Sequence, residues 1–239
     1  MKTLTPRKTL AGGIARVLKR LHYPLDVMLL YVRWYVAYSL SLRNLGEMIA
    51  EPGIEVDHST VHRRVIKLVP LFEKTFGKRK LPVGKSWRMD ETYIKVKGQW
   101  KYFYRAVDKA VKTIDFLLRA KRDKVAAQCF FEESIAQKGA PERVTIDKSD
   151  SNLAALQAVN AEREMPIQIR QVEYLNDVVE QDRRAIKRIT PPMPGFKDFS
   201  CVRVILSGIE LMHMIKKGQV KCRGETPLSL PQQFYSLVS

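Results

Sequence analysis

The spacing of apolar residues divides the chain into a helical first part and a mixed second part. Between residues 21 and 77 apolar positions recur every three to four residues, which is the period of a helix that buries one face. We expect three helices there, over residues 25–38, 42–50 and 57–69, with Ser41 and Asp57 as the N-caps of the second and third. Pro52 and Gly53 separate those two helices.

The third predicted helix has two different faces. Its aliphatic residues between positions 61 and 69 fall on one side and are expected to be buried. The other side carries a polar and basic set: Ser59, Thr60, His62, Arg63 and Lys67. Such a helix after a tight turn is typical of a helix-turn-helix, whose second helix enters the DNA major groove. An ordinary helical hairpin with a solvated face fits the same pattern, and His58 and His62 lack the nearby third ligand of a metal site.

The second part begins after a short basic segment, residues 78–86, which Pro82 and Gly84 mark as an interdomain linker. Aromatic and β-branched residues then predict an antiparallel meander of three strands, over 87–96, 99–107 and 113–118. Helices and strands alternate beyond it, and the expected ranges are 124–137, 143–147, 152–163, 167–171 and 176–189. This order predicts an α/β fold, a mixed sheet flanked by helices with crossover connections in its second half.

We therefore expect five segments in the chain. They are a basic N-terminal extension at 1–20, an all-α helix-turn-helix domain at 21–77, the linker at 78–86, an α/β domain at 87–220 and a C-terminal tail at 221–239. The tail shows no strong pattern, so we assign it no role.

Composition narrows the class of protein. A chain of 239 residues that is 45% hydrophobic can bury a real core, which excludes disordered and collagen-like classes. Its three cysteines are widely spaced and predict neither a disulfide framework nor a thiolate zinc site. The start lacks the pattern of a secretory signal, and the most apolar run, 27–42, is broken by Arg33 and shorter than a membrane span. We expect a cytoplasmic protein without a membrane partner.

Positive charge is concentrated in the flanks of the chain. The formal net charge is +17; residues 1–20 hold six basic and no acidic residues, and residues 183–223 hold ten basic and two acidic ones. The segment between 81 and 182 is nearly neutral. Because each neutralised phosphate releases counterions, such flanks favour a polyanion, and nucleic acid is the leading partner. A merely solvated basic surface remains the alternative.

Three carboxylates take positions that allow catalysis on this predicted fold. Asp90 lies in the first strand, Asp147 ends the fourth strand, and Glu180 lies inside the last helix. Crossover topology sets the first and fourth strands side by side, and the helix packs across the sheet. Carboxylate oxygens suit Mg²⁺, and two ions about 4 Å apart promote reactions at a phosphodiester, which indicates nuclease or strand-transfer chemistry.

Each of these acids has a less specific explanation. A strand-end aspartate is often a turn former, and a helical glutamate beside an arginine is often a surface ion pair. Other acids also compete for the second position: Asp150 most closely, and more weakly Asp108, Asp115 and Asp182.

Four segments closely resemble the DDE transposases of small bacterial insertion sequences. They are Trp-Arg-Met-Asp-Glu-Thr-Tyr-Ile-Lys-Val at 87–96, Tyr-Arg-Ala-Val-Asp at 104–108, Thr-Ile-Asp-Lys at 145–148, and the stretch from Tyr174 to Asp182. More narrowly, the chain is similar to the short single-gene elements whose transposase forms cointegrates. Asp147 and Glu180 are 33 positions apart, close to the spacing of the second and third acids in that family.

The resemblance implies a ribonuclease H-like, integrase-type catalytic domain preceded by the helix-turn-helix domain. It implies binding to the terminal inverted repeats of the element, then Mg²⁺-dependent 3′-end cleavage and strand transfer into target DNA. Two Mg²⁺ ions are expected, with Mn²⁺ as a substitute. The implied substrate is double-stranded DNA, and the implied location is the bacterial nucleoid. Because the substrate has two ends, we expect a homodimer or larger synaptic complex.

Carried over by position, Asp90, Asp147 and Glu180 match the catalytic, metal-binding acids, and Lys187 matches a basic residue that holds a terminal phosphate. Glu180, Arg184 and Lys187 share a helix face. The residues expected to contact DNA are Ser59, Thr60, His62, Arg63, Lys67, Arg184 and Arg188.

The chain departs from the family pattern at a few positions. Arg183 stands where histidine is usual, Asp177 stands where asparagine is usual, and Lys109-Ala110 replaces an Asp-Gly-like turn. These departures motivate one alternative, a catalytically decayed protein that binds DNA ends without cutting them. A ribonuclease H-like nuclease acting on RNA–DNA hybrids or junctions is another, although it leaves the helix-turn-helix unexplained.

Overall fold

The chain forms two compact units. The computed structural model describes residues 24–51, 53, 56–172, 184, 186–190, 193, 198–222 and 227–238. One unit, here the helical unit, comprises residues 1–80, 191–193 and 204–239; the other, the sheet unit, comprises 81–190 and 194–203. This division differs from the boundary expected at 220, because residues from 204 onward pack with the N-terminal helices.

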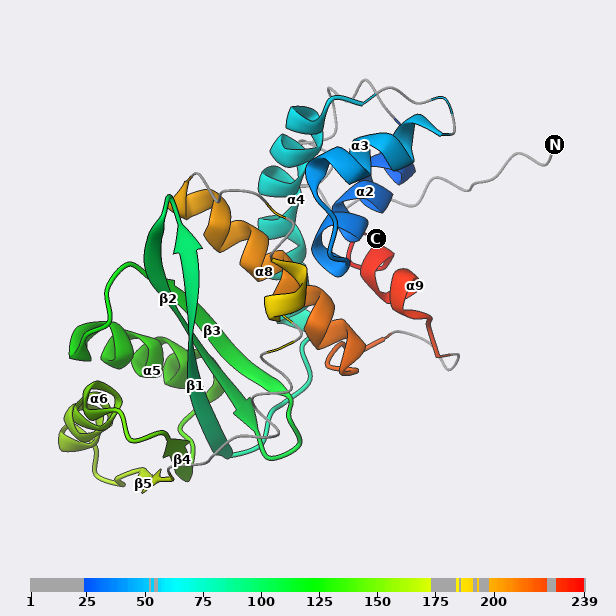
Figure 1. Ribbon diagram of the computed structural model, residues 1–239. Helices are drawn as coiled ribbons and strands as arrows, with labels where there is room; N and C mark the ends of the chain where they lie inside the picture. Colours follow the sequence, from blue (N-terminus) through cyan, green and yellow to red (C-terminus); the bar gives the residue numbers. More distant parts are fainter. Residues whose placement is uncertain are drawn as a thin grey trace. The chain divides into compact units, whose positions relative to one another are not determined.

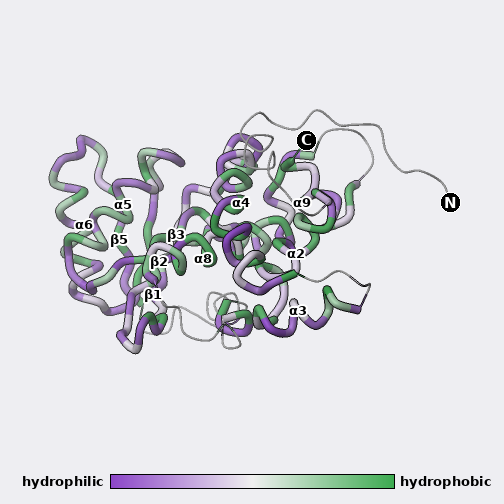
Figure 2. The backbone as a smooth tube through the Cα atoms, turned by 90° about the horizontal axis from the view of Figure 1, so that it is seen from above, coloured by the Kyte–Doolittle hydropathy of each residue, from purple (hydrophilic) through white to green (hydrophobic). Residues whose placement is uncertain are grey.

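Three helices begin the helical unit: α2 (Leu25–Ala37), α3 (Leu42–Ala50) and α4 (His58–Arg79) (Figure 1). The first two match the predicted ranges closely, and the third begins where predicted. Ser41 caps α3 as predicted, because its Oγ accepts a hydrogen bond from the Asn44 backbone at 3.1 Å, and Asn44 Oδ1 accepts one from the Ser41 backbone at 3.0 Å. Asp57 takes the N-cap position of α4 without a side-chain capping bond. Hydrophilic and hydrophobic positions alternate along α4 (Figure 2), and the aliphatic face expected between 61 and 69 is buried.

Helix α4 continues ten residues beyond its predicted end at Val69. Pro70 lies inside the helix and is exposed, although a proline in this position removes a backbone hydrogen bond and usually ends a helix. Phe72 and Phe76 follow at helical spacing and are fully buried, and their burial offsets that loss. The first residues of the expected linker, Lys78 and Arg79, therefore belong to α4.

The C-terminal part of the helical unit contains α8 (Phe199–Lys216), which begins in the sheet unit, and α9 (Leu230–Tyr235). A Cβ at Gly208 would lie 2.7 Å from Cγ1 of Val36 and 3.1 Å from Cγ2 of Val69, so the close approach of α8 to α2 and α4 requires glycine. In α9, Phe234 is buried and its ring packs edge to face on Phe72, with 5.0 Å between centroids. The tail to which we assigned no role is thus part of the core.

A five-stranded mixed sheet with the order β3-β2-β1-β4-β5 forms the centre of the sheet unit. Its strands are β1 (Ser86–Val96), β2 (Gln99–Asp108), β3 (Thr113–Arg119), β4 (Arg143–Ile146) and β5 (Gln168–Gln171). The first three pair antiparallel, whereas β4 runs parallel to β1 and to β5. This confirms the predicted meander, the crossovers and the mixed sheet flanked by helices.

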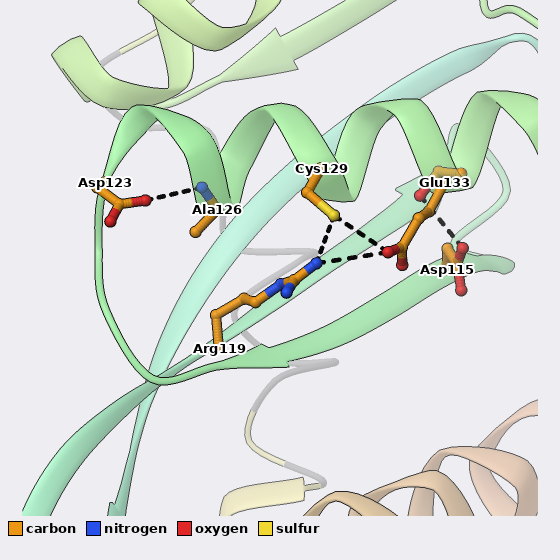
Figure 3. A network of polar contacts seen from close by, with 7 residues as sticks. Asp115, Arg119, Asp123, Ala126, Cys129 and Glu133 are labelled. Carbon is orange, nitrogen blue, oxygen red and sulfur yellow. Dashed lines mark hydrogen bonds and ion pairs between the residues drawn. The ribbon is translucent and has the colours of Figure 1, made fainter.

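Helices α5 (Lys124–Lys138) and α6 (Asp150–Ala161) pack against one face of this sheet. Trp87, Met89 and Tyr104 from the strands meet Phe130 and Phe131 of α5 in the main core of the unit. Polar contacts also attach α5 to β3 (Figure 3). Arg119 contacts Cys129 and lies 3.4 Å from Glu133 Oε1, Ser134 donates to Asp115 at 3.2 Å, and Asp123 caps the helix through the Ala126 backbone at 2.8 Å.

The turn between β2 and β3 gives Asp108 a structural role. Asp108 is buried and its carboxylate accepts hydrogen bonds from the backbones of Ala110, Lys112 and Gly84 at 2.9, 2.9 and 2.8 Å. Its role is therefore to form the turn. Val111 in the same turn has φ 62°, a left-handed conformation that is strained for a β-branched residue.

In the described part of the chain, no helix is long and apolar enough to cross a membrane.

Candidate active site

Strand register brings the first two predicted acids together. Strands β1 and β4 pair in parallel with Trp87 opposite Val144 and Arg88 opposite Thr145. Continuing this register by two residues sets Asp90 beside Asp147, which directly follows β4. Paired residues of neighbouring parallel strands point to the same face and lie about 5 Å apart. Both acids are half-buried, so their carboxylates are accessible without being fully solvated.

The side chain of Asp147 is oriented by the start of α6. Asn152, which is fully buried, donates from Nδ2 to Asp147 Oδ1 at 3.4 Å. Asp150, the alternative to Asp147 as the second acid, is exposed. It is the first residue of α6, although the predicted helix began only at residue 152. Asp115 accepts from Ser134 and from the Phe116 backbone, which gives it a structural role in β3.

Charged residues that the sequence analysis overlooked surround Asp90. Register pairs Asp90 with Arg105 of β2, a buried residue whose Nη2 donates to Thr113 Oγ1 at 3.0 Å. The neighbouring Glu91 is also buried, and Arg122 Nε lies 2.8 Å from its Oε1. A charged residue that alternates along β1 with the apolar Trp87 and Met89 was the available signal for Glu91. Its pairing with Arg122, 31 positions away, carries no pattern in the sequence.

The charges of Asp90 and Asp147 are felt at Glu91. Burial raises the pKa of the Glu91 carboxyl above its usual value, Arg122 lowers it, and the negative charges of Asp147 and Asp90 raise it further. Both of those aspartates therefore lie close enough to Glu91 for their charges to be felt.

The third predicted acid, Glu180, lies outside the described residues, as do Asp177, Asp182 and Arg183. Arg184, Lys187 and Arg188 are described, helical and exposed. Three exposed basic residues within five positions form a positively charged surface, which suits contact with phosphates.

The donor set suits Mg²⁺. Carboxylate oxygens on two neighbouring strands are hard ligands, and Mg²⁺ is commonly held by one or two protein carboxylates plus waters and substrate phosphates. Within the ranges that the structure describes, no group of three or more His, Cys, Asp and Glu side chains could hold a metal.

The predicted DNA-reading residues lie at the start of α4. Ser59, Arg63 and Lys67 are exposed and follow one another at a spacing of four, whereas Thr60 and His62 are half-buried. Arg63 is held by its own helix, because its Nη2 donates to Thr60 Oγ1 at 3.2 Å and to Ser59 Oγ at 3.4 Å. Asp57 accepts a hydrogen bond from Ser59, which lowers the pKa of the Asp57 carboxyl.

Comparisons with known proteins agree with this arrangement. A family model described as a DDE domain matches residues 84–219. The transposase of the insertion sequence-like element IS431mec from Staphylococcus aureus (strain Mu50) is 36% identical over 194 residues, 80% of this chain and 85% of that protein. The transposase of IS257 in transposon Tn4003, also from Staphylococcus aureus, has the same identity and coverage.

Among solved structures, the HTLV-2 integrase catalytic core domain in complex with magnesium is similar with a TM-score of 0.41 and 16% identity, over 56% of this chain and 88% of that one. The catalytic core domain of BIV integrase gives a TM-score of 0.40 and 14% identity, over 65% and 93%. On the extent of the family match and of the relatives' identity, the chain belongs to the DDE transposases of insertion sequences.

Proposed function

We propose that this protein binds the terminal inverted repeats of its own insertion sequence, cleaves their 3′ ends and joins those ends to target DNA. The observation that supports the proposal is the parallel register of β1 and β4: Arg88 pairs with Thr145, and the same register continued by two residues would set Asp90 beside Asp147 on one face of the sheet. Two carboxylates so arranged, in a chain that belongs to the DDE transposases, supply the protein ligands that this chemistry needs.

Asp90, Asp147 and Glu180 are proposed to hold two Mg²⁺ ions, for which Mn²⁺ could substitute. Bound there, the ions would activate the attacking hydroxyl and stabilise the leaving oxygen of the phosphodiester. Asn152 fixes the Asp147 carboxylate for this task through its 3.4 Å hydrogen bond. Lys187 is proposed to hold the terminal phosphate, and Arg184 and Arg188 the neighbouring DNA backbone, because all three are exposed cations.

Recognition of the repeats is assigned to the exposed side of α4. In this proposal Ser59, Thr60, His62, Arg63 and Lys67 contact the DNA, and the arginine is oriented beforehand by its bonds to Ser59 and Thr60. The charge of +17 would strengthen binding to both repeat and target DNA. Since an element has two ends, a homodimer or larger synaptic complex is the expected active form, at the nucleoid in the bacterial cytoplasm.

The test uses labelled DNA from both sides of the protein's own gene, incubated with Mg²⁺ or Ca²⁺. We expect new 3′-hydroxyl ends at the element boundary with Mg²⁺, and none with Asp90→Asn, Asp147→Asn or Glu180→Gln, each of which should still bind the DNA. Asp150→Asn is the matched control, because Asp150 is exposed three positions after Asp147 and should be dispensable.

Three other results would contradict the proposal. Cleavage retained by all three variants would remove the assigned acids from the reaction. Binding to the ends without any cleavage by the wild type would favour the decayed, binding-only protein. A preference for RNA–DNA hybrids over duplex DNA would favour the nuclease.

A further inference from the structure

Glu91 is a buried acid that the proposed reaction does not use. Its side chain is 4% exposed, and the register of β1 with β2 places it opposite Tyr104, on the side of the sheet that α5 covers. Burying a carboxylate is costly unless a cation compensates its charge. Arg122 supplies that cation at 2.8 Å from the loop between β3 and α5.

Arg122 has a second contact, at the start of α6. Its Nη2 donates to Ser149 Oγ at 3.4 Å, and Ser149 follows Asp147 by two residues. Ser149 occupies the N-cap position of α6, yet its hydroxyl makes no capping hydrogen bond there. That hydroxyl instead contacts Arg122 and Ser151, the latter at 3.0 Å.

The two ends of this bridge lie beside the two candidate metal ligands. Glu91 is the neighbour of Asp90 on β1, and Ser149 belongs to the loop that carries Asp147 after β4. The backbone beside the arginine is anchored, because the next residue, Asp123, caps α5 through a 2.8 Å hydrogen bond with the Ala126 backbone. The Arg122 guanidinium thus connects both acid-bearing segments.

From this geometry we propose that Arg122 is a positioning residue for the metal site: by pairing with Glu91 and Ser149 it fixes the separation of the Asp90 and Asp147 carboxylates. The inference rests on the proposed function of those two acids. Two carboxylates bind one cation well only when they are held at the correct separation. Losing the bridge should therefore weaken metal binding, even though removing a nearby positive charge would by itself strengthen it.

Arg119 offers a matched control on the adjoining strand. It also joins a strand to α5, through an ion pair with Glu133 at 3.4 Å, but the two side chains are 36% and 50% exposed. It contacts neither Glu91 nor Ser149 in the described hydrogen bonds and ion pairs. Arg119→Gln therefore removes the same charge and a comparable link between strand and helix without touching the bridge.

The experiment compares full-length wild type, Arg122→Gln, Arg122→Lys and Arg119→Gln. Mn²⁺ binding is measured without DNA by electron paramagnetic resonance, and boundary cleavage is measured over a range of Mg²⁺ concentrations. For Arg122→Gln we expect the Mn²⁺ dissociation constant to rise at least about threefold and cleavage at saturating Mg²⁺ to fall at least about tenfold. Arg122→Lys, which keeps the charge, should recover part of both losses, and Arg119→Gln should stay within about twofold of wild type.

The outcomes separate this inference from the proposed function. Unchanged or tighter Mn²⁺ binding by folded Arg122→Gln would overturn the positioning role. Equal losses in Arg122→Gln and Arg119→Gln, accompanied by equal falls in melting temperature, would reduce Arg122 to a structural ion pair and also overturn it. A wild type that neither binds Mn²⁺ nor cleaves would instead contradict the proposed function, whatever the variants do.

Discussion

The face of α4 that we propose to contact DNA and the acidic end of the sheet are built in opposite ways. The residues of the α4 face lie within nine positions of one helix, and Arg63 is oriented by Ser59 and Thr60, its own neighbours in the sequence. The sheet site combines residues from β1, β4 and the loop before α5, so that Asp90 and Asp147 meet across 57 positions.

This difference determines how each site should respond to substitution. Side chains that contact a ligand one by one from a rigid helix should contribute almost independently. Side chains that must be held together at a set distance should fail as a group, because losing one removes the function of the others. The predictions below test that contrast.

The largest expected effect is the loss of cleavage in Asp90→Asn and Asp147→Asn, at least about 10³-fold for each. The double variant should cleave no more slowly than either single variant, because one missing ligand already disables the metal pair. Initial cleavage rates on labelled repeat DNA measure this. Losses that multiply in the double variant would show that the two acids act independently.

On α4 the expected effects are smaller and additive. Arg63→Ala should weaken binding to the repeat by about 1 to 3 kcal/mol and relax sequence preference, whereas Lys67→Ala should weaken binding to all sequences and lower the salt dependence by about one ion. Titrations at several salt concentrations measure both. Lys74→Ala, at an exposed position two turns further along the same helix, is the control and should change neither sequence preference nor cleavage.

Local pattern was enough to predict most of the elements. Apolar spacing and the Ser41 cap gave α3 within its observed bounds, and β-branched and aromatic runs gave the meander within one residue at each end. The crossovers followed from the order of elements alone, and they predicted β1 beside β4. The approximate position of the first two acids could therefore be deduced from the sequence.

Features that depend on distant packing could not be deduced. Pro70 indicated the end of a helix, but burial of Phe72 and Phe76 continues α4 to Arg79. The C-terminal tail showed no strong pattern, and the place of α9 in the core depends on a ring contact between Phe234 and Phe72. The Arg122 bridge likewise links three segments, and no short-range pattern predicts it.

The β2–β3 turn allows a test of local strain beside the long-range site. Val111→Gly should raise the free energy of unfolding by about 0.5 to 1 kcal/mol, because relief of the strained left-handed conformation exceeds the entropic cost of glycine. Urea denaturation measures this. Ala110→Gly is the matched control: Ala110 does not have a positive φ, so the same change should destabilise. Stabilisation by both variants would contradict the role of φ.

The smallest effect concerns His62, at the border between the two faces of α4. Burial lowers the pKa of its imidazole, so the folded protein favours the neutral form. Below the ordinary histidine pKa of about 6.5 the unfolded chain binds the proton more readily, and stability should fall as the pH decreases from 7 to 5. In His62→Gln that decrease, measured by urea denaturation at each pH, should be smaller. If His62→Gln lost as much stability over this pH range as the wild type, burial of the imidazole would not be the cause.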